Sequence, residues 1–331
     1  MKILLIQTAF IGDVVLATPL IERLKEQFGD KSSIDFLLKK GNESLLDGHP
    51  YIRQVLIFDK KKGKYRHLWH LIRQIRSESY DCVINLHRFF SSGLICLLSG
   101  AKETRGFQKN PLSFAFTKSF QHIIGQTHDP QHEVNRNLSL LQGLASSAFC
   151  RPKLYPSEED FQVVPAEQDY LCIAPASIWY TKQFPEDKWM KLIQRLASSY
   201  HIYLLGGPSD RALCERIQQS THSRKVEVLA GELSFLQSAA LMSGAQMNIV
   251  NDSAPLHFAS AMNAPVTAIF CSTVPAFGFW PLSDQSVVVE TQHQLSCRPC
   301  GLHGKTACPE GHFRCAEIET EHILATISRE F

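Results

Sequence analysis

One candidate catalytic group is a carboxylate near the N-terminus. The apolar residues 3–6 lead into Gly12 and Asp13, and a helical pattern follows. Asp13 is therefore expected where the chain leaves a strand for a helix, the place at which parallel α/β domains hold ligands. A carboxylate there can accept a proton from an attacking hydroxyl. It can also simply cap a helix beginning at Val14, because aspartate is a favoured N-cap residue.

A second set of candidates lies in the C-terminal half and suits a phosphate group. Ser177, Thr181 and Lys182 fall between a predicted strand and a predicted helix, where hydroxyls and an amine stand beside free helix amides. Residues 252–254 and His257 follow another strand, and the helix amides there could bind a diphosphate. The plainer alternatives are a solvated lysine, a helix cap and a buried core histidine.

A glycine pair marks a third strand-to-turn junction. Gly206 and Gly207 follow the apolar residues 204–205, and they permit either close approach of a ligand or a tight bend. The first strand has no G-x-G-x-x-G after it, which disfavours a dinucleotide oxidoreductase.

The composition is that of an ordinary soluble protein whose charge is unevenly spread. The 331 residues are 44% apolar and 20% charged, with no long apolar run or leader pattern, so we expect a cytoplasmic protein. Residues 1–155 carry 22 Lys/Arg and 13 Asp/Glu, a balance of +9, and the remainder carries 12 and 19, a balance of −7. The basic half favours an anionic partner at a membrane surface or on a phosphorylated molecule. Nothing points to nucleic acid.

Four of the ten cysteines form a cluster near the C-terminus: Cys297, Cys300, Cys308 and Cys315. Their spacing could bind zinc or form disulfides, but the second pair lacks the tight spacing of a zinc ribbon. We expect a reduced structural loop and no metal.

Alternating strand and helix signals run through both halves and predict parallel sheets covered by helices. A polar, proline-rich stretch at residues 150–165 reads as a linker, so the predicted domains are 1–155 and 156–331. The first has predicted strands at 2–7, 33–38, 54–58, 81–86 and 103–106, and helices at 13–28, 42–47, 65–78, 90–99 and 131–144. The second has predicted strands at 170–174, 201–205, 226–228, 247–250 and 265–269, helices at 185–199, 208–219, 233–242 and 254–262, a cysteine-rich loop at 297–315 and a closing helix at 316–329.

The segment from Lys60 to Arg76 carries seven basic residues and no acid. Its residues Tyr65, Leu68, Ile72 and Ile75 recur at helical spacing, with Trp69 alongside. Such a helix can rest on anionic lipid, or it can bury its apolar stripe and leave its charges in solvent. Both alternatives stay open.

Several motifs together resemble glycosyltransferase family nine, which contains the ADP-heptose:lipopolysaccharide heptosyltransferases. In the first half they are residues 11–14 with Pro19, 80–87 and 100–107, and residues 132–137 are similar to the family's His-x-x-Glu-Arg segment, with Asn135 replacing its glutamate. In the second half they are the turn 175–185, residues 229–231, residues 251–253 with His257, and the tail 297–315. The matches follow the family's order over nearly the entire chain.

The resemblance implies a GT-B architecture, two Rossmann-like domains whose parallel sheets face a central cleft. It implies an inverting, metal-independent transfer of heptose from ADP-heptose to the lipid A–core oligosaccharide, with no cofactor beyond the donor substrate. Asp13 would be the general base, and Lys182 would stabilise the departing diphosphate. The implied donor-binding residues are Ser177, Thr181, Lys182, Gly206, Gly207, Asp252, Ser253, Ala254 and His257. The implied acceptor-binding residues are Gly12, His87, Arg88, Arg105, His132 and Arg136.

Two departures from the family pattern leave other readings open. Gln7 stands where members commonly have arginine, and Ala254 where they usually have glycine. The alternatives are a glycosyltransferase that uses another nucleotide sugar, a nucleotide-sugar epimerase of the same fold, and a non-catalytic carbohydrate-binding protein. The expected location is the cytoplasm, with peripheral contact at the inner face of the inner membrane through residues 60–76.

Overall fold

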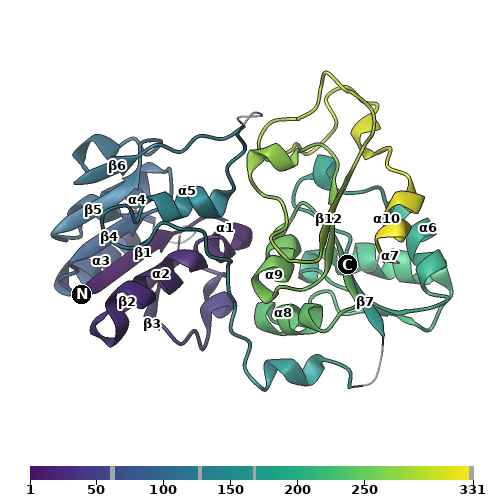
Figure 1. The fold of residues 1–331 in the computed structure, drawn as a ribbon, viewed down its shortest axis with the longest axis horizontal. Coiled ribbons are helices and arrows are strands. Elements are labelled where there is room, and N and C mark those ends of the chain that lie inside the picture. Colours follow the sequence, from purple (N-terminus) through teal and green to yellow (C-terminus); the bar gives the residue numbers. More distant parts are fainter. Residues whose placement is uncertain (60–63, 126–128, 167–168, 328–331) are drawn as a thin grey trace. The chain divides into compact units, whose positions relative to one another are not determined.

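The chain divides into two compact units, the first reaching to Tyr155 and the second beginning at Pro156, except that Asp129 and Pro130 group with the second (Figure 1). The computed structural model describes residues 1–59, 64–125, 129–166 and 169–327. Among these residues, no helix is both long enough and apolar enough to cross a lipid bilayer.

The first unit is built on a six-stranded parallel sheet in the order β3-β2-β1-β4-β5-β6. Its central strand β1 is almost wholly buried, as expected for a parallel strand covered on both faces. The direction in which strands are added reverses between β1 and β4, so a crevice for ligands is expected at the carboxyl ends of these two. The strands are β1 (Lys2–Gln7), β2 (Ser33–Lys39), β3 (Ile52–Phe58), β4 (Cys82–Asn85), β5 (Glu103–Phe107) and β6 (Lys118–Phe120).

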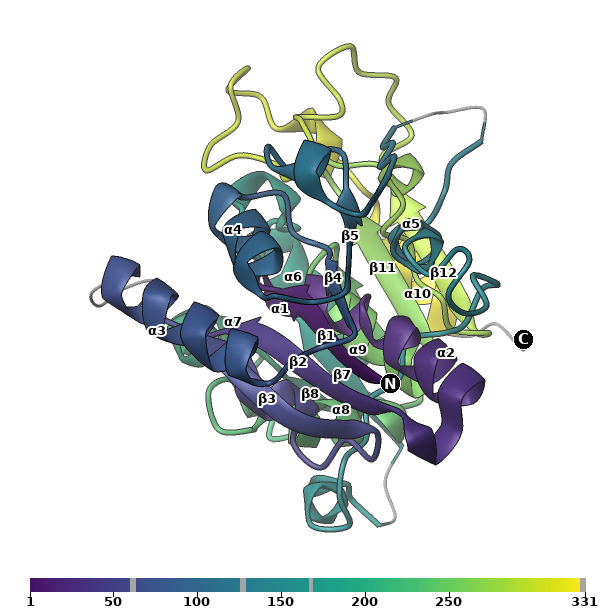
Figure 2. The same cartoon turned by 90° about the vertical axis from the view of Figure 1, so that its left-hand side faces the viewer.

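Helices cover both faces of this sheet (Figure 2). Helices α3 (Lys64–Ser77) and α4 (Phe90–Leu98) lie on one face, and α2 (Thr18–Phe28) and α5 (Glu133–Ser139) lie on the other. The apolar side of α3 packs into the core between this helix and the sheet. In that core, Leu68, Leu71, Ile72 and Ile75 join Leu4, Ile6 and Val83. Burial of this stripe is the reason that so basic a segment is helical.

The predicted helix at 13–28 is wrong in its extent, because the chain forms two helices there. Helix α1 (Ile11–Val15) ends before α2 begins at Thr18. Pro19 has no amide to donate to the carbonyl of Val15, four residues earlier. The hydroxyl of Thr18 donates to that carbonyl instead, at 2.8 Å.

The second unit repeats the plan with a parallel sheet in the order β12-β11-β10-β7-β8-β9. Counted along the unit, this is the same order as in the first sheet, and the reversal falls between β7 and β10. The strands are β7 (Tyr170–Ala174), β8 (His201–Leu204), β9 (Val226–Val228), β10 (Met247–Asn251), β11 (Val266–Phe270) and β12 (Ser286–Glu290). The helices are α6 (Glu186–Leu196), α7 (Arg211–Thr221), α8 (Phe235–Ser243), α9 (Ala254–Met262) and α10 (Thr320–Ile327).

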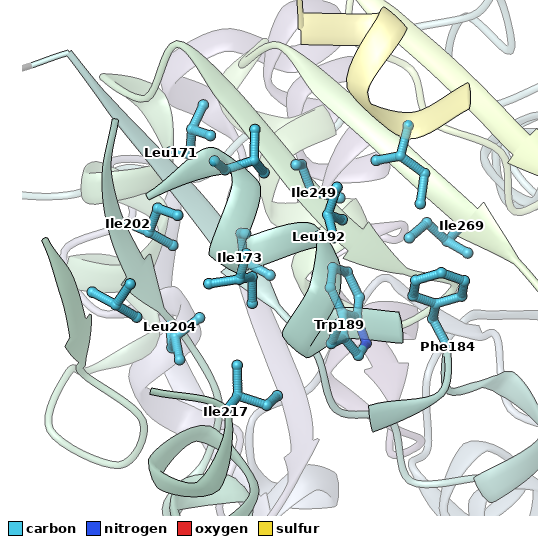
Figure 3. Close-up of a cluster of buried hydrophobic side chains, with 14 of the residues drawn as sticks. Leu171, Ile173, Phe184, Trp189, Leu192, Ile202, Leu204, Ile217, Ile249 and Ile269 are labelled. Atoms are coloured by element: carbon cyan, nitrogen blue, oxygen red, sulfur yellow. The ribbon is translucent and has the colours of Figure 1, made fainter. Parts of the chain in front are cut away.

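An aromatic pair anchors the core between the second sheet and helix α6 (Figure 3). The rings of Phe184 and Trp189 meet edge to face, with their centroids 5.3 Å apart. Ile173, Ile249 and Ile269 come to this core from three neighbouring strands. Phe184 ends the turn after β7, so the core also fixes the end of that turn.

Other predicted elements also differ in detail from the structure. Strands β6 and β12 were not predicted, and residues 42–47 form a 3-10 turn at Glu43–Leu46. Residues 208–219 form a 3-10 turn before α7. The closing helix begins at Thr320 and not at residue 316, after a 3-10 turn at Arg314–Ala316, and its predicted last residues lie outside the described part of the chain.

Candidate active site

Asp13 lies in the first turn of α1, after the carboxyl end of β1. The helix begins at Ile11 with Phe10 as its N-cap residue, so the alternative in which Asp13 caps a helix from Val14 is wrong. The Asp13 carboxylate accepts a hydrogen bond from the Phe10 amide at 3.1 Å, and its side chain is half-buried. This bond orients the carboxylate, and a carboxylate can accept several hydrogen bonds at once, so the bond is compatible with a role as proton acceptor.

The turns that follow β1, β4 and β5 are joined to one another around His87. The Nδ1 atom of His87 lies 3.0 Å from the hydroxyl of Thr8, and the Asn110 side chain donates to the His87 carbonyl at 2.9 Å. His87 is buried, whereas the neighbouring Arg88 is exposed with its guanidinium over the Phe89 ring. Residues from three strand ends therefore meet at the position where the strand order reverses.

Lys109, which no sequence motif singles out, belongs to the same edge of the first sheet. By surface area its side chain is exposed, yet many atoms surround its amine, which lies 4.9 Å from the centre of the Phe107 ring. The charge is on the amine, so the crowding there governs its ionisation. Desolvation lowers the pKa of Lys109 to about 8, although the negative charges of Glu133 and Asp13 favour its protonated form.

Three of the predicted acceptor-binding residues make contacts that hold the first unit together. Arg105 is fully buried, and its guanidinium donates to the carbonyls of Leu140 and Gln142, both at 2.9 Å. His132 caps α5 by accepting a hydrogen bond from the Val134 amide. Arg136 is buried and pairs with Glu133 at 2.7 Å. With its guanidinium inside the fold, Arg105 is withdrawn from the candidate site.

In the second unit, the centre of the site is an ion pair between two strand-end turns. The Lys182 amine lies 2.6 Å from Oδ2 of Asp252, and both side chains are largely buried. The Thr273 hydroxyl, after β11, donates to the same carboxylate oxygen at 2.6 Å. The strands β7, β10 and β11 are neighbours in the sheet. The segments that follow their ends thus contribute one side chain each to a single cluster.

A buried amide fixes the geometry of the turn that carries Lys182. Asn251, the last residue of β10, accepts a hydrogen bond from the Phe184 amide at 2.9 Å and donates to the Pro175 carbonyl at 2.8 Å. Both ends of the turn after β7 are therefore bound to the same side chain. Among the predicted residues in between, Ser177 is half-buried, and its carbonyl accepts from Gln183.

Helix α9 begins beside this cluster. Ser253 is its N-cap residue in an extended conformation, and its hydroxyl lies against the Asn251 carbonyl at 3.3 Å. Within the described part of the chain, that hydroxyl makes no capping bond to the first-turn amides, which begin at Ala254. Of the first three helix residues, Pro255 has no amide and Leu256 donates to the Ser253 carbonyl at 3.1 Å, which leaves the Ala254 amide for an anion. His257, one turn along, is buried with its ring 6.4 Å from that of Phe279.

Three other predicted donor-binding residues have close neighbours within the fold. Thr181 is fully buried, so its side chain cannot touch a donor in this conformation. The Gly207 amide donates to the carboxylate of Asp210 at 2.9 Å, and a side chain at Gly206 would lie 2.8 Å from Asp210. The glycine pair therefore makes a tight bend closed by Asp210, and its contact with the donor stays a prediction.

The four cysteines of the C-terminal cluster are free thiols, and the Sγ atom of Cys297 lies 3.9 Å from Nε2 of His312. Over the described ranges, no three His, Cys, Asp or Glu side chains converge in a way that could hold a metal ion.

Comparison with known proteins identifies the family. The family model described as glycosyltransferase family 9 (heptosyltransferase) matches residues 68–307. The chain belongs to glycosyltransferase family 9. It is 30% identical over 312 residues to lipopolysaccharide heptosyltransferase 3 of Escherichia coli K12, covering 86% of this chain and 88% of that protein. This protein is therefore a glycosyltransferase, which sets aside the epimerase and the non-catalytic alternatives.

Solved structures show the same fold. The E. coli ADP-heptose lipopolysaccharide heptosyltransferase II matches with a TM-score of 0.81 at 20% identity, covering 99% of this chain and 97% of that one. The E. coli heptosyltransferase WaaC, solved with ADP-2-deoxy-2-fluoro heptose, matches with a TM-score of 0.72 at 20% identity, covering 87% and 92%. The predicted GT-B architecture of two Rossmann-like domains is confirmed.

Proposed function

We propose that this enzyme transfers a heptose from ADP-heptose to the core oligosaccharide of a lipopolysaccharide precursor. The observation that carries the proposal is the cluster of Lys182, Asp252 and Thr273 beside the start of α9, where the second sheet reverses its strand order. An amine and the Ala254 amide at a helix N-terminus suit a diphosphate. The sugar and the acceptor are proposed from the names of the relatives, a lipopolysaccharide heptosyltransferase and a WaaC structure with an ADP-heptose analogue.

The proposed chemistry is a single displacement with inversion. The acceptor hydroxyl attacks the anomeric carbon of the heptose, and its proton passes to Asp13. The bond between the anomeric carbon and the diphosphate oxygen breaks, and ADP leaves with the electron pair. Lys182 and the Ala254 amide at the start of α9 stabilise the negative charge that grows on the diphosphate, and stabilisation of this type commonly contributes more to catalysis than any other effect. No metal takes part in this scheme.

We further propose that the basic first unit approaches the anionic membrane surface, at the cytoplasmic face, where a lipid-linked acceptor would lie. In α3 the apolar stripe is buried, while Arg66, Arg73, Arg76 and Trp69 are exposed. Exposed arginines beside a tryptophan suit an anionic lipid surface. Residues 60–63, which carry three further lysines of the proposed contact, lie outside the described part of the chain.

The test is to incubate purified enzyme with ADP-heptose and a heptose-deficient lipopolysaccharide core. We expect ADP release together with a mass increase of one heptose on the acceptor. ADP release without a change in acceptor mass would contradict the proposed acceptor. If other nucleotide sugars support transfer while ADP-heptose does not, the donor assignment is wrong.

A further inference from the structure

The cysteine-rich loop spans residues 297–315. Its starting segment, residues 297–305, is hydrogen-bonded to the end of strand β11. The Arg298 guanidinium donates to the Thr273 carbonyl at 2.8 Å, and the Cys300 amide donates to the Ser272 carbonyl at 2.9 Å. Ser272 and Thr273 follow β11 closely, so the loop cannot move without disturbing that strand end.

Lys305, the last residue of this starting segment, is joined to the turn after β7. The Lys305 amide donates to the Thr181 hydroxyl oxygen at 2.8 Å, and the Thr181 amide donates to the Lys305 carbonyl at 3.1 Å. The same hydroxyl oxygen accepts from Ser272 at 2.9 Å. Since Thr181 is fully buried, its side chain joins the loop, the turn and the end of β11 from the inside.

Between these two sets of hydrogen bonds, Gly304 lies directly against the methylene chain (the stem) of Lys182. An added Cβ at Gly304 would be 2.9 Å from Cγ of Lys182 and 3.0 Å from the Thr181 hydroxyl oxygen. Real Cβ atoms do not approach so closely, and Cγ is near the base of the lysine side chain. The Lys182 stem would therefore have to move, although its amine is the group that reaches Asp252.

We propose that Gly304 is a positioning residue for Lys182. Because it has no side chain, the cysteine-rich loop can lie against the lysine stem and direct the amine toward Asp252. The proposal deepens the function proposed above, because it makes the loop a part of the diphosphate site through Lys182.

A second glycine of the same loop provides a matched control. Gly301 has the same φ of +75° as Gly304, so alanine strains the backbone equally at either position. An added Cβ at Gly301 meets no described atom within 4 Å. The difference between Gly304→Ala and Gly301→Ala therefore separates the crowding of Lys182 and its neighbours Thr181 and Ser272 from backbone strain, and the double-mutant cycle below identifies the part that acts through Lys182.

The first test measures ADP affinity by titration calorimetry. Gly304→Ala is expected to weaken ADP binding about tenfold, the usual effect of losing a hydrogen bond to a charged group. Gly301→Ala is expected to stay within about twofold of the parent protein. Equal affinities for the two variants would overturn the proposal.

The second test asks whether Gly304 acts through Lys182. In a double-mutant cycle, adding Gly304→Ala to Lys182→Ala should cost no further ADP affinity, because the group that it displaces is already gone. Additive losses would show that Gly304 acts by another route and would contradict the proposal.

The third test needs no ligand and separates this proposal from the proposed function. A crystal structure of Gly304→Ala should show the Lys182–Asp252 ion pair broken, whereas Gly301→Ala should keep it. If wild-type enzyme fails to bind ADP, the proposed donor is wrong, and these two structures still decide the role of Gly304. Should Gly304→Ala not fold, Thr181→Val should break the same ion pair and Thr181→Ser should keep it, because serine retains the hydroxyl that holds the loop.

Discussion

At the scale of single residues, the two proposed catalytic groups are each held by a short-range contact. The Phe10 amide orients the carboxylate of Asp13, and Asp252 holds the amine of Lys182. Positioning of this kind reduces the rearrangement required when charge develops in the transition state. The effect of each group on catalysis should therefore be separable from its effect on stability.

Replacing Asp13 by asparagine should leave the fold intact and remove turnover. The asparagine side chain can still accept a hydrogen bond from the Phe10 amide through its oxygen, but it cannot take the acceptor proton. We expect kcat to fall by about 10²- to 10⁴-fold, with ADP affinity unchanged. Steady-state kinetics with calorimetry for ADP would check this, and a kcat within about tenfold of the parent would exclude Asp13 as the base.

Lys182→Ala should weaken the binding of ADP and slow the chemical step. Removing the amine takes away the charge proposed to bind the diphosphate and leaves Asp252 buried without its cation. Lys182→Arg keeps the charge and serves as the comparison. The outcome is read from kcat, KM and the affinity for ADP, and unchanged values in the alanine variant would remove Lys182 from the site.

Sequence reasoning placed Lys182 and Asp252 at strand ends because polar residues after an apolar run are conspicuous there. It could not place Thr181 in the interior, because that depends on Lys305, 124 residues away. Thr273 was overlooked, although a polar pair directly after the apolar run of β11 is the same signal that identified Asp252. Lys109 gave a weaker signal, since an isolated lysine beyond a strand is usually solvated.

At the scale of elements, a buried ion cluster ties helix α5 to the first unit. Glu133 contacts His122 at 3.0 Å and Arg136 at 2.7 Å, and all three are buried. Burial by itself would raise the pKa of Glu133, but the hydrogen bond from His122 and the nearby positive charges lower it to about 2. Glu133 therefore stays ionised at neutral pH and balances Arg136.

Glu133→Ala should destabilise the first unit by about 3 kcal/mol, because it leaves Arg136 buried without a counter-ion. The matched control is Glu186→Ala, which removes an exposed ion pair with Arg216 and should cost at most about 1 kcal/mol. Urea unfolding followed by circular dichroism measures both. Similar losses for the two variants would show that the buried cluster is not what anchors α5.

The central strands of both sheets and the edge strands β3 and β9 were predicted well, whereas the edge strands β6 and β12 were missed. Strands such as β1 and β7 are uninterrupted apolar runs, which is typical of buried parallel strands. Strand β6 is short and mostly exposed, so it has neither an apolar run nor alternation. The break between α1 and α2 was missed although Pro19 signals it, because the apolar pattern continues across it.

At the scale of the whole molecule, the chain consists of two units with separate cores, and only the second carries the proposed nucleotide site. Units of this kind commonly unfold in separate transitions. A ligand that binds one folded unit raises the stability of that unit. Calorimetry can therefore assign the nucleotide site to a unit without reference to how the two are arranged.

Scanning calorimetry should show two transitions, of which ADP raises one. Trp189→Ala removes a fully buried side chain from the second core and should reduce the free energy of unfolding of that unit by roughly 3–5 kcal/mol. The midpoint temperature of the ADP-sensitive transition should therefore fall. Ile75→Ala, in the core of the first unit, should lower the other. A shift of the Ile75-sensitive transition on adding ADP would place the nucleotide in the wrong half of the chain for the proposed mechanism.

The parallel order of the first sheet has a consequence for synthesis on the ribosome. Strand β1 pairs on one side with β2, but its other edge pairs with β4, in which Cys82 lies opposite Ile3. At typical elongation rates of about 5–20 residues per second, β4 is synthesised roughly 4–16 s after β1, and that edge of β1 stays unpaired until then. During this interval the nascent chain presents an apolar strand with open hydrogen-bonding groups, the kind of surface that chaperones bind.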